Sequence, residues 1–351
     1  MKVALLNDQL NAGGAEKVLV NIANLLHQKG ITVVVVLFMQ PSALDKQLHP
    51  GIPVFYLHRK GRFDLRAMRH LKQLVQHCDI VHVHSRYNLR YFMLTKYLLG
   101  IYAPKVVFHE HVPEYRSIHK ITARLLGRTD AYVAVLQTIC DWAKQGIVSS
   151  NKVYYLPNIV AAPPTEIHQN GAGPNALMIG NFRRVKNHLF AIQVIESLPA
   201  HFTLDLYGMV EDRVYFEELE AYIRQNNLQK RVRIIEGMNN VYDVLQHYNF
   251  ALHTATLETG PLVLLEYMHA ALPFVTHDTG DVPTNIKPLL PQLVLSDLNV
   301  ESWKNRILNV MQNEAELKQV RQKMSGLINE LYTKEKYWEQ LKRVYNNVLS
   351  N

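Results

Sequence analysis

Short apolar runs and longer amphipathic stretches alternate along almost the whole chain. Lys2–Leu6 and Ile31–Phe38 are short runs rich in Val, Ile and Leu, and the segment Ala15–Gln28 between them carries apolar residues at helical spacing. A β-branched run without polar alternation is typical of a strand that is buried on both faces. The pattern therefore predicts a β-α-β unit at the start of the chain.

The same alternation continues through the first half and begins again in the second. Further strands are expected at Val54–Leu57, Ile80–His84, Lys105–His109, Ala131–Val135, Val153–Leu156, Ala176–Ile179, Thr203–Tyr207, Val232–Ile235, Phe250–His253 and Phe274–Thr276. Helices are expected between them at Leu65–Gln76, Leu89–Leu99, Ile118–Leu126, Ile139–Lys144, His188–Ser197, Val214–Arg224 and Val241–Leu245, and at the end at Val300–Gln312, Glu314–Leu331 and Lys334–Leu349. Strands that alternate with helices favour parallel sheets with helices on both faces, so the predicted class is doubly wound α/β.

Length and a change of composition predict two domains. A chain of 351 residues exceeds the size of a typical single core. Segment 161–174 is rich in Pro, Gly and Ala without sustained periodicity, which is typical of a linker. We expect an α/β domain over 1–160, a second over 175–333, and a final amphipathic helix over 334–351.

The net charge of +8 is concentrated in the amino-terminal half. Its densest segment, Arg59–Lys72, interleaves Arg and Lys with Phe63, Leu65, Met68 and Leu71 at near-helical spacing. A basic amphipathic helix can bind an anionic membrane surface, which predicts weak peripheral contact through this segment. In the alternative interpretation the apolar stripe packs on a sheet and the charges are merely solvated.

Several other functional classes are poorly supported. The first ten residues do not resemble a signal peptide, and the longest apolar run, Ile31–Met39, is too short to span a bilayer. We therefore expect a cytoplasmic protein, with any membrane contact at the inner face of the cell membrane. Cys78 and Cys140 lie far apart without a C-x-x-C motif, so we expect reduced thiols without chemical function. No nucleic-acid-binding motif accompanies the basic half, and nucleic acid is not expected as a partner.

The stretch Thr256–Pro273 holds two carboxylates eight residues apart, Glu258 and Glu266, with Gly260-Pro261 between them. Proline is favoured at the first position of a helix, so a helix is predicted to begin at Pro261. Glu258 then lies in the preceding loop, and the N–H groups at the helix start offer an anion site. A buried carboxylate needs hydrogen-bond donors, and sugar or ribose hydroxyls are suitable. Alternatively, both acids are ordinary solvated residues.

Two loops that follow the first strand of each domain are further candidates. Ligands of doubly wound domains bind at the carboxyl ends of the strands, and we expect the site in the cleft between the two sheets. Asn7–Glu16 contains Gly13-Gly14 but not G-x-G-x-x-G, so a nicotinamide or flavin dinucleotide is poorly supported. Gly180–His188 contributes cations near a helix start that could bind a diphosphate, namely Arg183, Arg184 and Lys186, although basic surface turns are common.

Two His-x-His pairs, His82/His84 and His109/His111, suggest a metal site as an alternative. Alternate residues of a strand share a face, so each pair could present two imidazoles together. No acidic or cysteine partner stands at a fixed spacing, and no D-x-D motif occurs. We therefore expect no metal and no cofactor.

Taken in order, these motifs resemble those of the retaining glycosyltransferases of family 4, which have the GT-B fold of two facing Rossmann-like domains. The resemblance covers essentially the whole chain and rests on Gly13–Glu16, Asp79–His84, His109–His111, Leu156–Asn158, Gly180–His188, Tyr207-Gly208 and the Glu258/Glu266 pair with Pro261 between. The aromatic helix 334–351 is similar to the family's last helix, which crosses back to the first domain. Each motif is weak alone, but their order and spacing are specific.

The resemblance implies a role for each matching residue. Glu266 would hold the ribose hydroxyls, Glu258 would contact the donor hexose, and His111 would lie near the reacting sugar. The diphosphate would be neutralised by Arg183 and Lys186. Further donor-binding positions would be Gly13, Gly14, Gly180, Tyr207, Gly260, Pro261 and Leu262, and the acceptor side would include Glu16, His109 and Glu110.

The implied reaction is the metal-independent, retaining transfer of a hexose from a UDP- or GDP-sugar to a glycan or lipid-linked acceptor, in bacterial surface polysaccharide assembly. A nucleotide-sugar 2-epimerase of the same fold and a catalytically silent subunit that binds a partner or membrane are the alternatives. Three departures from the family pattern leave the donor open: Asn181 in place of Arg, Ala270-Ala271-Leu272 in place of a glycine, and Gly280-Asp281 in place of Gly-Gly. Because of Asn181, the cationic role falls to Arg183 or Arg184, and we favour Arg183.

Overall fold

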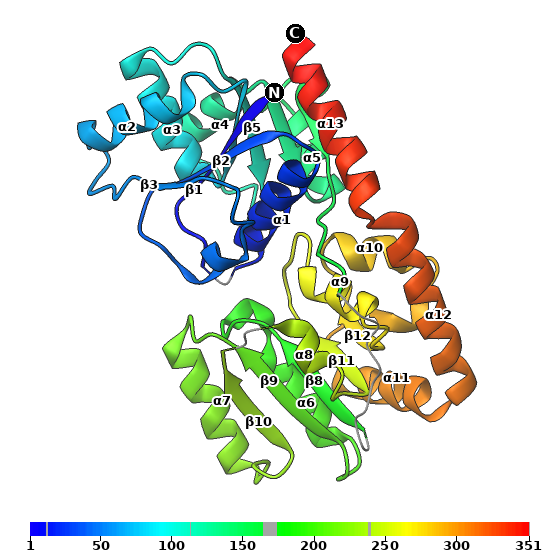
Figure 1. Ribbon diagram of the computed structural model, residues 1–351. Coiled ribbons are helices and arrows are strands. Elements are labelled where there is room, and N and C mark those ends of the chain that lie inside the picture. The colour runs from blue at the N-terminus through cyan, green and yellow to red at the C-terminus, as the bar shows by residue number, and fades with distance from the viewer. Residues whose placement is uncertain (12, 113, 164–173, 238–239, 351) are drawn as a thin grey trace. The chain divides into compact units, whose positions relative to one another are not determined.

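The computed structural model describes residues 1–351 except 12, 113, 164–173, 238–239 and 351. The chain divides into two compact units, one formed by Met1–Ile159 with Lys334–Asn351 and the other by Val160–Thr333 (Figure 1). Most of the predicted linker, residues 164–173, lies outside the described residues. Each unit is described by itself.

The first unit contains a seven-stranded parallel sheet in the order β3-β2-β1-β4-β5-β6-β7. Its strands are β1 (Lys2–Asn7), β2 (Thr32–Leu37), β3 (Val54–Tyr56), β4 (Ile80–His84), β5 (Lys105–Glu110), β6 (Ala131–Ala134) and β7 (Val153–Tyr155). Its helices are α1 (Gly14–Gln28), η1 (Ala43–Gln47), α2 (Leu65–Val75), α3 (Arg86–Leu99), α4 (Lys120–Leu126), α5 (Gln137–Lys144), η2 (Ser150–Lys152) and α13 (Lys334–Ser350). The strand order reverses between β1 and β4, which is where doubly wound sheets bind ligands.

The second unit repeats this architecture with a six-stranded parallel sheet in the order β10-β9-β8-β11-β12-β13. Its strands are β8 (Asn175–Ile179), β9 (Thr203–Gly208), β10 (Val232–Glu236), β11 (Phe250–His253), β12 (Phe274–His277) and β13 (Val294–Leu295). Its helices are η3 (Arg184–Lys186), α6 (His188–Ser197), α7 (Arg213–Gln225), α8 (Val241–Leu245), α9 (Leu262–His269), α10 (Asp281–Ile286), η4 (Pro291–Leu293), α11 (Val300–Gln312) and α12 (Glu314–Leu331). The predicted α/β class is confirmed in both units.

The last helix, α13, belongs to the first unit although it follows the second in sequence. Its apolar face is buried through Tyr337, Leu341, Val344, Tyr345 and Val348. These residues recur at helical spacing, so a single face of α13 supplies all the packing.

The basic segment Arg59–Lys72 is divided by the structure. Met68 and Leu71 are buried in the core beneath α2, whereas Phe63 and Leu65 are 67% and 51% exposed. Arg59 is also buried and forms an ion pair with Asp8. The packing alternative therefore holds for the carboxyl-terminal half of the stripe. Among the described helices, none has the length and apolar character needed to cross a membrane.

Candidate active site

The Glu258/Glu266 stretch folds as a loop followed by a helix. Pro261 occupies the cap position with φ −66° and α9 begins at Leu262, one residue later than predicted. Glu258 lies in the loop, and Glu266 lies within α9 with only 6% of its surface exposed. The start of α9 follows Gly260, so its first N–H groups lie between the two acids along the chain.

A second loop fixes the position of Glu258. Gly280 caps α10 with φ +87°, and a Cβ there would lie 3.0 Å from both Pro261 Cδ and Thr259 O. The backbone N–H of Glu258 donates to Thr279 Oγ1 at 3.1 Å. Only glycine combines this backbone conformation with such close contact. Gly280 thus supports the loop that carries Glu258. In the sequence it was notable only as part of Gly280-Asp281, which stands in place of Gly-Gly.

Glu258 is bonded to a partly buried cation, Lys186. Lys186 Nζ donates to Glu258 Oε1, and His253 Nε2 lies 3.6 Å from the same oxygen. Burial alone would raise the pKa of Glu258, but attraction to Lys186 and the nearby His253 imidazole together lower it to about 2. The carboxylate is therefore ionised at neutral pH and its oxygens act as hydrogen-bond acceptors.

The loop that carries Lys186 is pinned at both ends. Gly180 N donates to Tyr207 O at 2.8 Å, which ties the loop to β9. At the other end, Thr254 Oγ1 lies 3.1 Å from Lys186 O and 2.9 Å from Asn187 O. A Cβ on Gly180 would lie 3.5 Å from Lys186 Cδ, so the lysine stem runs close to this glycine.

The two arginines of this loop have different environments. Arg184 NH2 lies 2.5 Å from Glu218 Oε1, and its guanidinium stacks on Tyr215, so it is bound to α7. Arg183 NH1 is 3.6 Å from Glu211 Oε2, a looser pair in which both side chains are about half exposed.

Tyr207, a predicted donor-binding residue, joins a polar network in the second unit. Its hydroxyl is 3.0 Å from the hydroxyl of Tyr248, which donates to Asp205 Oδ2 at 2.5 Å. Arg233 NH2 also donates to Asp205 Oδ2. The Tyr207 hydroxyl is therefore hydrogen-bonded within this network, while the backbone carbonyl of Tyr207 accepts a hydrogen bond from Gly180 N.

In the first unit, Gly13 caps α1 with φ −109° and Gly14 begins the helix. A Cβ on Gly13 would lie 2.2 Å from Glu16 Oε2, so the Glu16 carboxylate folds back over the start of its own helix. An acidic side chain is stabilised there by the helix dipole. The space at Gly13 is thus used by Glu16, which sequence reasoning had placed on the acceptor side.

His109 and Glu110 end β5 and are fully buried. Glu110 Oε2 accepts from Arg86 Nε at 2.6 Å, and the other oxygen accepts from Val112 N at 3.2 Å. Arg86 also donates to the carbonyl of Tyr115 at 2.8 Å. These bonds anchor the backbone at Val112 and Tyr115. Acceptor-side roles for His109 and Glu110 remain predictions.

His111 directly follows β5 and is only partly buried. One of its nitrogens, Nε2, lies 3.0 Å from His84 Nδ1. Burial lowers the pKa of His111 to about 3, so the imidazole is neutral at physiological pH.

Three histidines at the ends of β4 and β5 approach one another, although their nitrogens are spread more widely than the ligands of a tetrahedral zinc ion. One ligand atom from each of His82, His84 and His109 can be chosen within 4.8 Å of the others, whereas nitrogens that share one tetrahedral zinc lie about 3.3 Å apart. The rings of His82 and His109 are stacked, with 16° between their planes. The nitrogen lone pairs of stacked imidazoles lie in nearly parallel planes, so they do not converge on a single metal ion.

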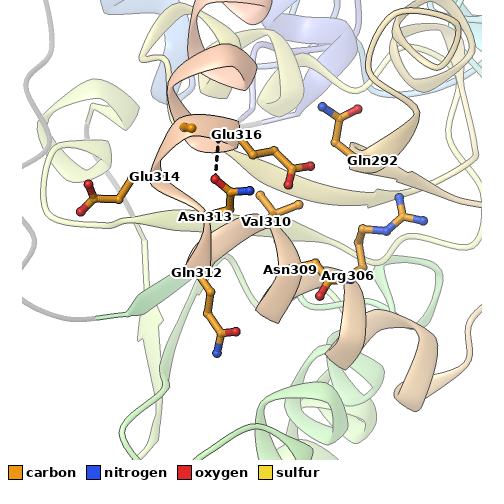
Figure 2. Close-up of a pocket in the computed structure, with 9 residues that line it drawn as sticks. Gln292, Arg306, Asn309, Val310, Gln312, Asn313, Glu314 and Glu316 are labelled. Atoms are coloured by element: carbon orange, nitrogen blue, oxygen red, sulfur yellow. Dashed lines mark hydrogen bonds between the residues drawn. The ribbon is translucent and has the colours of Figure 1, made fainter.

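A hollow of about 810 Å³ elsewhere in the second unit is lined by η4, α11 and the start of α12 (Figure 2). Its polar groups partly serve local structure: Arg306 NH1 donates to Pro291 O at 2.9 Å, and Asn313 Oδ1 accepts from Glu316 N at 3.1 Å. None of the candidate site residues lines it.

Sequence reasoning missed His253 and Thr279, which lie next to Glu258. It named His84 only as a possible metal ligand and as part of a motif, and did not predict its contact with His111. His253 ends a buried strand, as His84 does, and a polar residue at the carboxyl end of a parallel strand was the signal available for both.

Comparisons with known proteins agree with this architecture. Residues 12–162 match the family model described as Glycosyltransferase Family 4, and residues 166–325 match the one described as Glycosyl transferases group 1. The chain is 23% identical over 310 residues to the capsular polysaccharide biosynthesis glycosyltransferase CapH of Staphylococcus aureus, covering 82% of each chain.

Solved structures share the fold. HepE of Anabaena in complex with UDP-glucose superposes with a TM-score of 0.83 at 16% identity, covering 99% of both chains. A mutant of S. aureus TarM in complex with fondaparinux, α-GlcNAc-glycerol and UDP gives a TM-score of 0.83 at 11% identity, covering 98% of this chain and 99% of TarM. At these identities the likeness establishes the GT-B fold.

Proposed function

The chain belongs to the family 4 glycosyltransferases, and we propose that it transfers a hexose from a nucleotide sugar to a glycan or lipid-linked acceptor, with retention and without a metal. CapH, named for capsular polysaccharide biosynthesis, supports a role in bacterial surface polysaccharide assembly. HepE, solved with UDP-glucose, makes a UDP-hexose the first donor to test.

The observation that carries this proposal is the partly buried Lys186–Glu258 pair, in which the side chains are 17% and 14% exposed, just before the start of α9 in sequence. Departure of a nucleoside diphosphate builds negative charge on the leaving oxygens. A preorganised ammonium and the N–H groups at a helix start stabilise that charge without a metal ion. Lys186 would contact the diphosphate, and the ionised Glu258 would accept hydrogen bonds from hydroxyls of the hexose.

The remaining predicted roles extend this arrangement. Glu266, nearly buried on α9, would accept hydrogen bonds from the ribose hydroxyls. Arg183 would add a second cation because its pair with Glu211 is loose, whereas Arg184 is bound to α7. His111 would lie near the reacting sugar.

The first experiment is a thermal-shift screen against UDP, GDP, ADP, CMP and their common sugar conjugates, with and without a divalent metal. Selective stabilisation by one nucleotide identifies the donor class, because a ligand that binds only the native state raises its melting temperature. Transfer from that donor is then measured for variants. We expect Lys186→Ala to lower kcat about 100-fold or more, the usual cost of removing a group that stabilises the leaving charge.

Further variants separate the roles. Glu266→Ala should weaken nucleotide binding by about 10- to 100-fold, since hydrogen bonds to a charged group are lost. Arg183→Ala should reduce activity and Arg184→Ala should not, which makes the neighbours a matched pair. Wild-type turnover in folded Lys186→Ala and Glu266→Ala proteins would refute the site assignment.

We also propose weak membrane contact through the amino-terminal part of Arg59–Lys72. Phe63 and Leu65 are exposed next to Arg62, Arg66 and Arg69, whose side chains are also exposed. Cations beside exposed apolar groups fit an anionic bilayer surface.

Changing these three arginines to Ser should reduce sedimentation with anionic liposomes, and added salt should do the same in the wild type. Neutral liposomes serve as the control. Unchanged sedimentation of the triple variant would eliminate this surface as the contact.

A further inference from the structure

Four histidines form a contiguous cluster at the carboxyl ends of β4 and β5. His82 and His84 share one face of β4, and His84 pairs in register with His109 on β5. The ring of His111 stacks on that of His84 with centroids 5.2 Å apart and 12° between the planes. The cluster therefore connects His111, at the edge of the core, to fully buried imidazoles.

All four imidazoles are neutral at physiological pH. Burial lowers the pKa of His82 and His111 to about 3 and holds those of His84 and His109 well below the ordinary value. A neutral imidazole has one N–H donor and one acceptor nitrogen. In the contact between His84 Nδ1 and His111 Nε2, 3.0 Å long, one nitrogen must therefore donate and the other accept.

The surroundings of His84 decide which nitrogen donates. His84 Nε2 is buried and has no hydrogen-bond partner among the described residues. If Nε2 carried the proton, a buried N–H would be left without an acceptor, which is rarer in proteins than an unpaired acceptor. The favoured arrangement places the proton on His84 Nδ1 and leaves a lone pair on Nε2.

We propose that His84 is a positioning residue whose Nδ1–H donates to His111 Nε2 and holds His111 as the neutral tautomer with its proton on Nδ1. The proton of His111 then lies on Nδ1, and Nε2 cannot accept a proton without losing the bond to His84. The consequence for catalysis rests on the proposed function: His111 does not act as a general base through Nε2.

The tautomer can be read directly by nitrogen NMR of the full-length protein labelled with ¹⁵N-histidine, because the two ring nitrogens differ strongly in shift when only one is protonated. The His111 signals are assigned by their loss in His111→Gln. We expect Nδ1–H in the wild type, and in His84→Phe a shift toward Nε2–H, the form that free neutral histidine prefers.

Two variants control for simple loosening of the cluster. His84→Asn places an amide N–H where Nδ1–H was and should restore the wild-type signal. Tyr345→Phe removes a hydrogen bond at the other end of the cluster, the 2.8 Å contact with His82 Nδ1, and should leave the His111 tautomer unchanged.

Activity adds a second readout. In transfer from the donor found above, His84→Phe should lower kcat about tenfold with little change in KM, and His84→Asn should recover most of it. Nε2–H on His111 in the wild type would overturn the proposal, as would a change in Tyr345→Phe equal to that in His84→Phe. If His84→Phe does not fold, the wild-type spectrum decides. The expected tautomer combined with full activity of His111→Gln would refute the proposed role of His111 while the tautomer assignment stands.

Discussion

Glu258 is an ionised carboxylate in an almost closed environment, and this links its protonation to the stability of the second unit. Its pKa is lowered from 4.5 to about 2 by Lys186 and His253 against the effect of burial. A group whose pKa falls on folding stabilises the native state above its unfolded pKa and loses that contribution as pH falls through the folded pKa. The shift corresponds to stabilisation on the order of 3 kcal/mol at neutral pH.

We therefore predict that the difference in unfolding free energy between wild type and Glu258→Gln shrinks as pH falls from about 4.5 to about 2. Fluorescence of Trp303 can follow the second unit if Trp142 and Trp338 are replaced by Phe, since the chain has 3 tryptophans. In Lys186→Met the effect of burial on Glu258 is no longer offset by the lysine, so the pKa of Glu258 should rise on folding. The free energy of unfolding of this variant should therefore fall as pH rises. Parallel curves for wild type and Glu258→Gln would contradict the link.

At the residue scale the sequence predicted the two acids but not their partners. The spacing of Glu258 and Glu266 around Pro261 is local, so it placed one acid in a loop and the other in a helix. The bond between Lys186 and Glu258 joins residues 72 positions apart, and only the packing of β8 beside β11 brings them together. The contact between His84 and His111 depends in the same way on strand register.

Among the elements, the end of α9 contains one of the departures from the family pattern, Ala270-Ala271-Leu272. Ala271 follows the helix with φ +48°, a left-handed conformation that costs an L-residue roughly 1–2 kcal/mol and is usually taken by glycine. Ala270, one residue earlier, has φ −80° and ordinary helical geometry.

The two neighbours should thus respond with opposite sign. We predict that Ala271→Gly stabilises the second unit by about 1 kcal/mol and that Ala270→Gly destabilises it by a similar amount. Urea unfolding followed at Trp303 measures both. Destabilisation by both changes would mean that the Ala271 methyl contributes more through packing than its backbone strain costs.

The elements that the sequence missed are short. The pattern of apolar positions located every strand of five or six residues and every helix of ten or more to within about three residues. Helix α10 and strand β13, with 6 and 2 residues, are too short to show a period. Gly280 marked the start of α10, but its role depends on contact with Pro261, which local sequence does not reveal.

For the whole molecule, the least local feature is the membership of α13 in the first unit. Periodicity predicted the helix and its apolar face, but only resemblance to a family suggested where that face packs. In the structure Leu341 is fully buried within the first unit, while Ile307 on α11 is fully buried in the core of the second. The two side chains have similar volume and lie only 34 positions apart in the chain.

This arrangement predicts that a core substitution destabilises the unit whose core contains the residue, whatever the position of that residue in the sequence. Leu341→Ala should destabilise the first unit by about 2–5 kcal/mol and speed amide hydrogen exchange in β1 and β4. Ile307→Ala should do the same for β8 and β11, because each cavity weakens the core that encloses it. Hydrogen exchange resolved by peptide separates the two responses even though a two-unit chain need not unfold in one step. If Leu341→Ala instead raised exchange in β8 and β11 and spared β1, the packing of α13 would stabilise the second unit and not the first. The hydrogen bond between Tyr345 and His82 would then not be a native contact of the first unit.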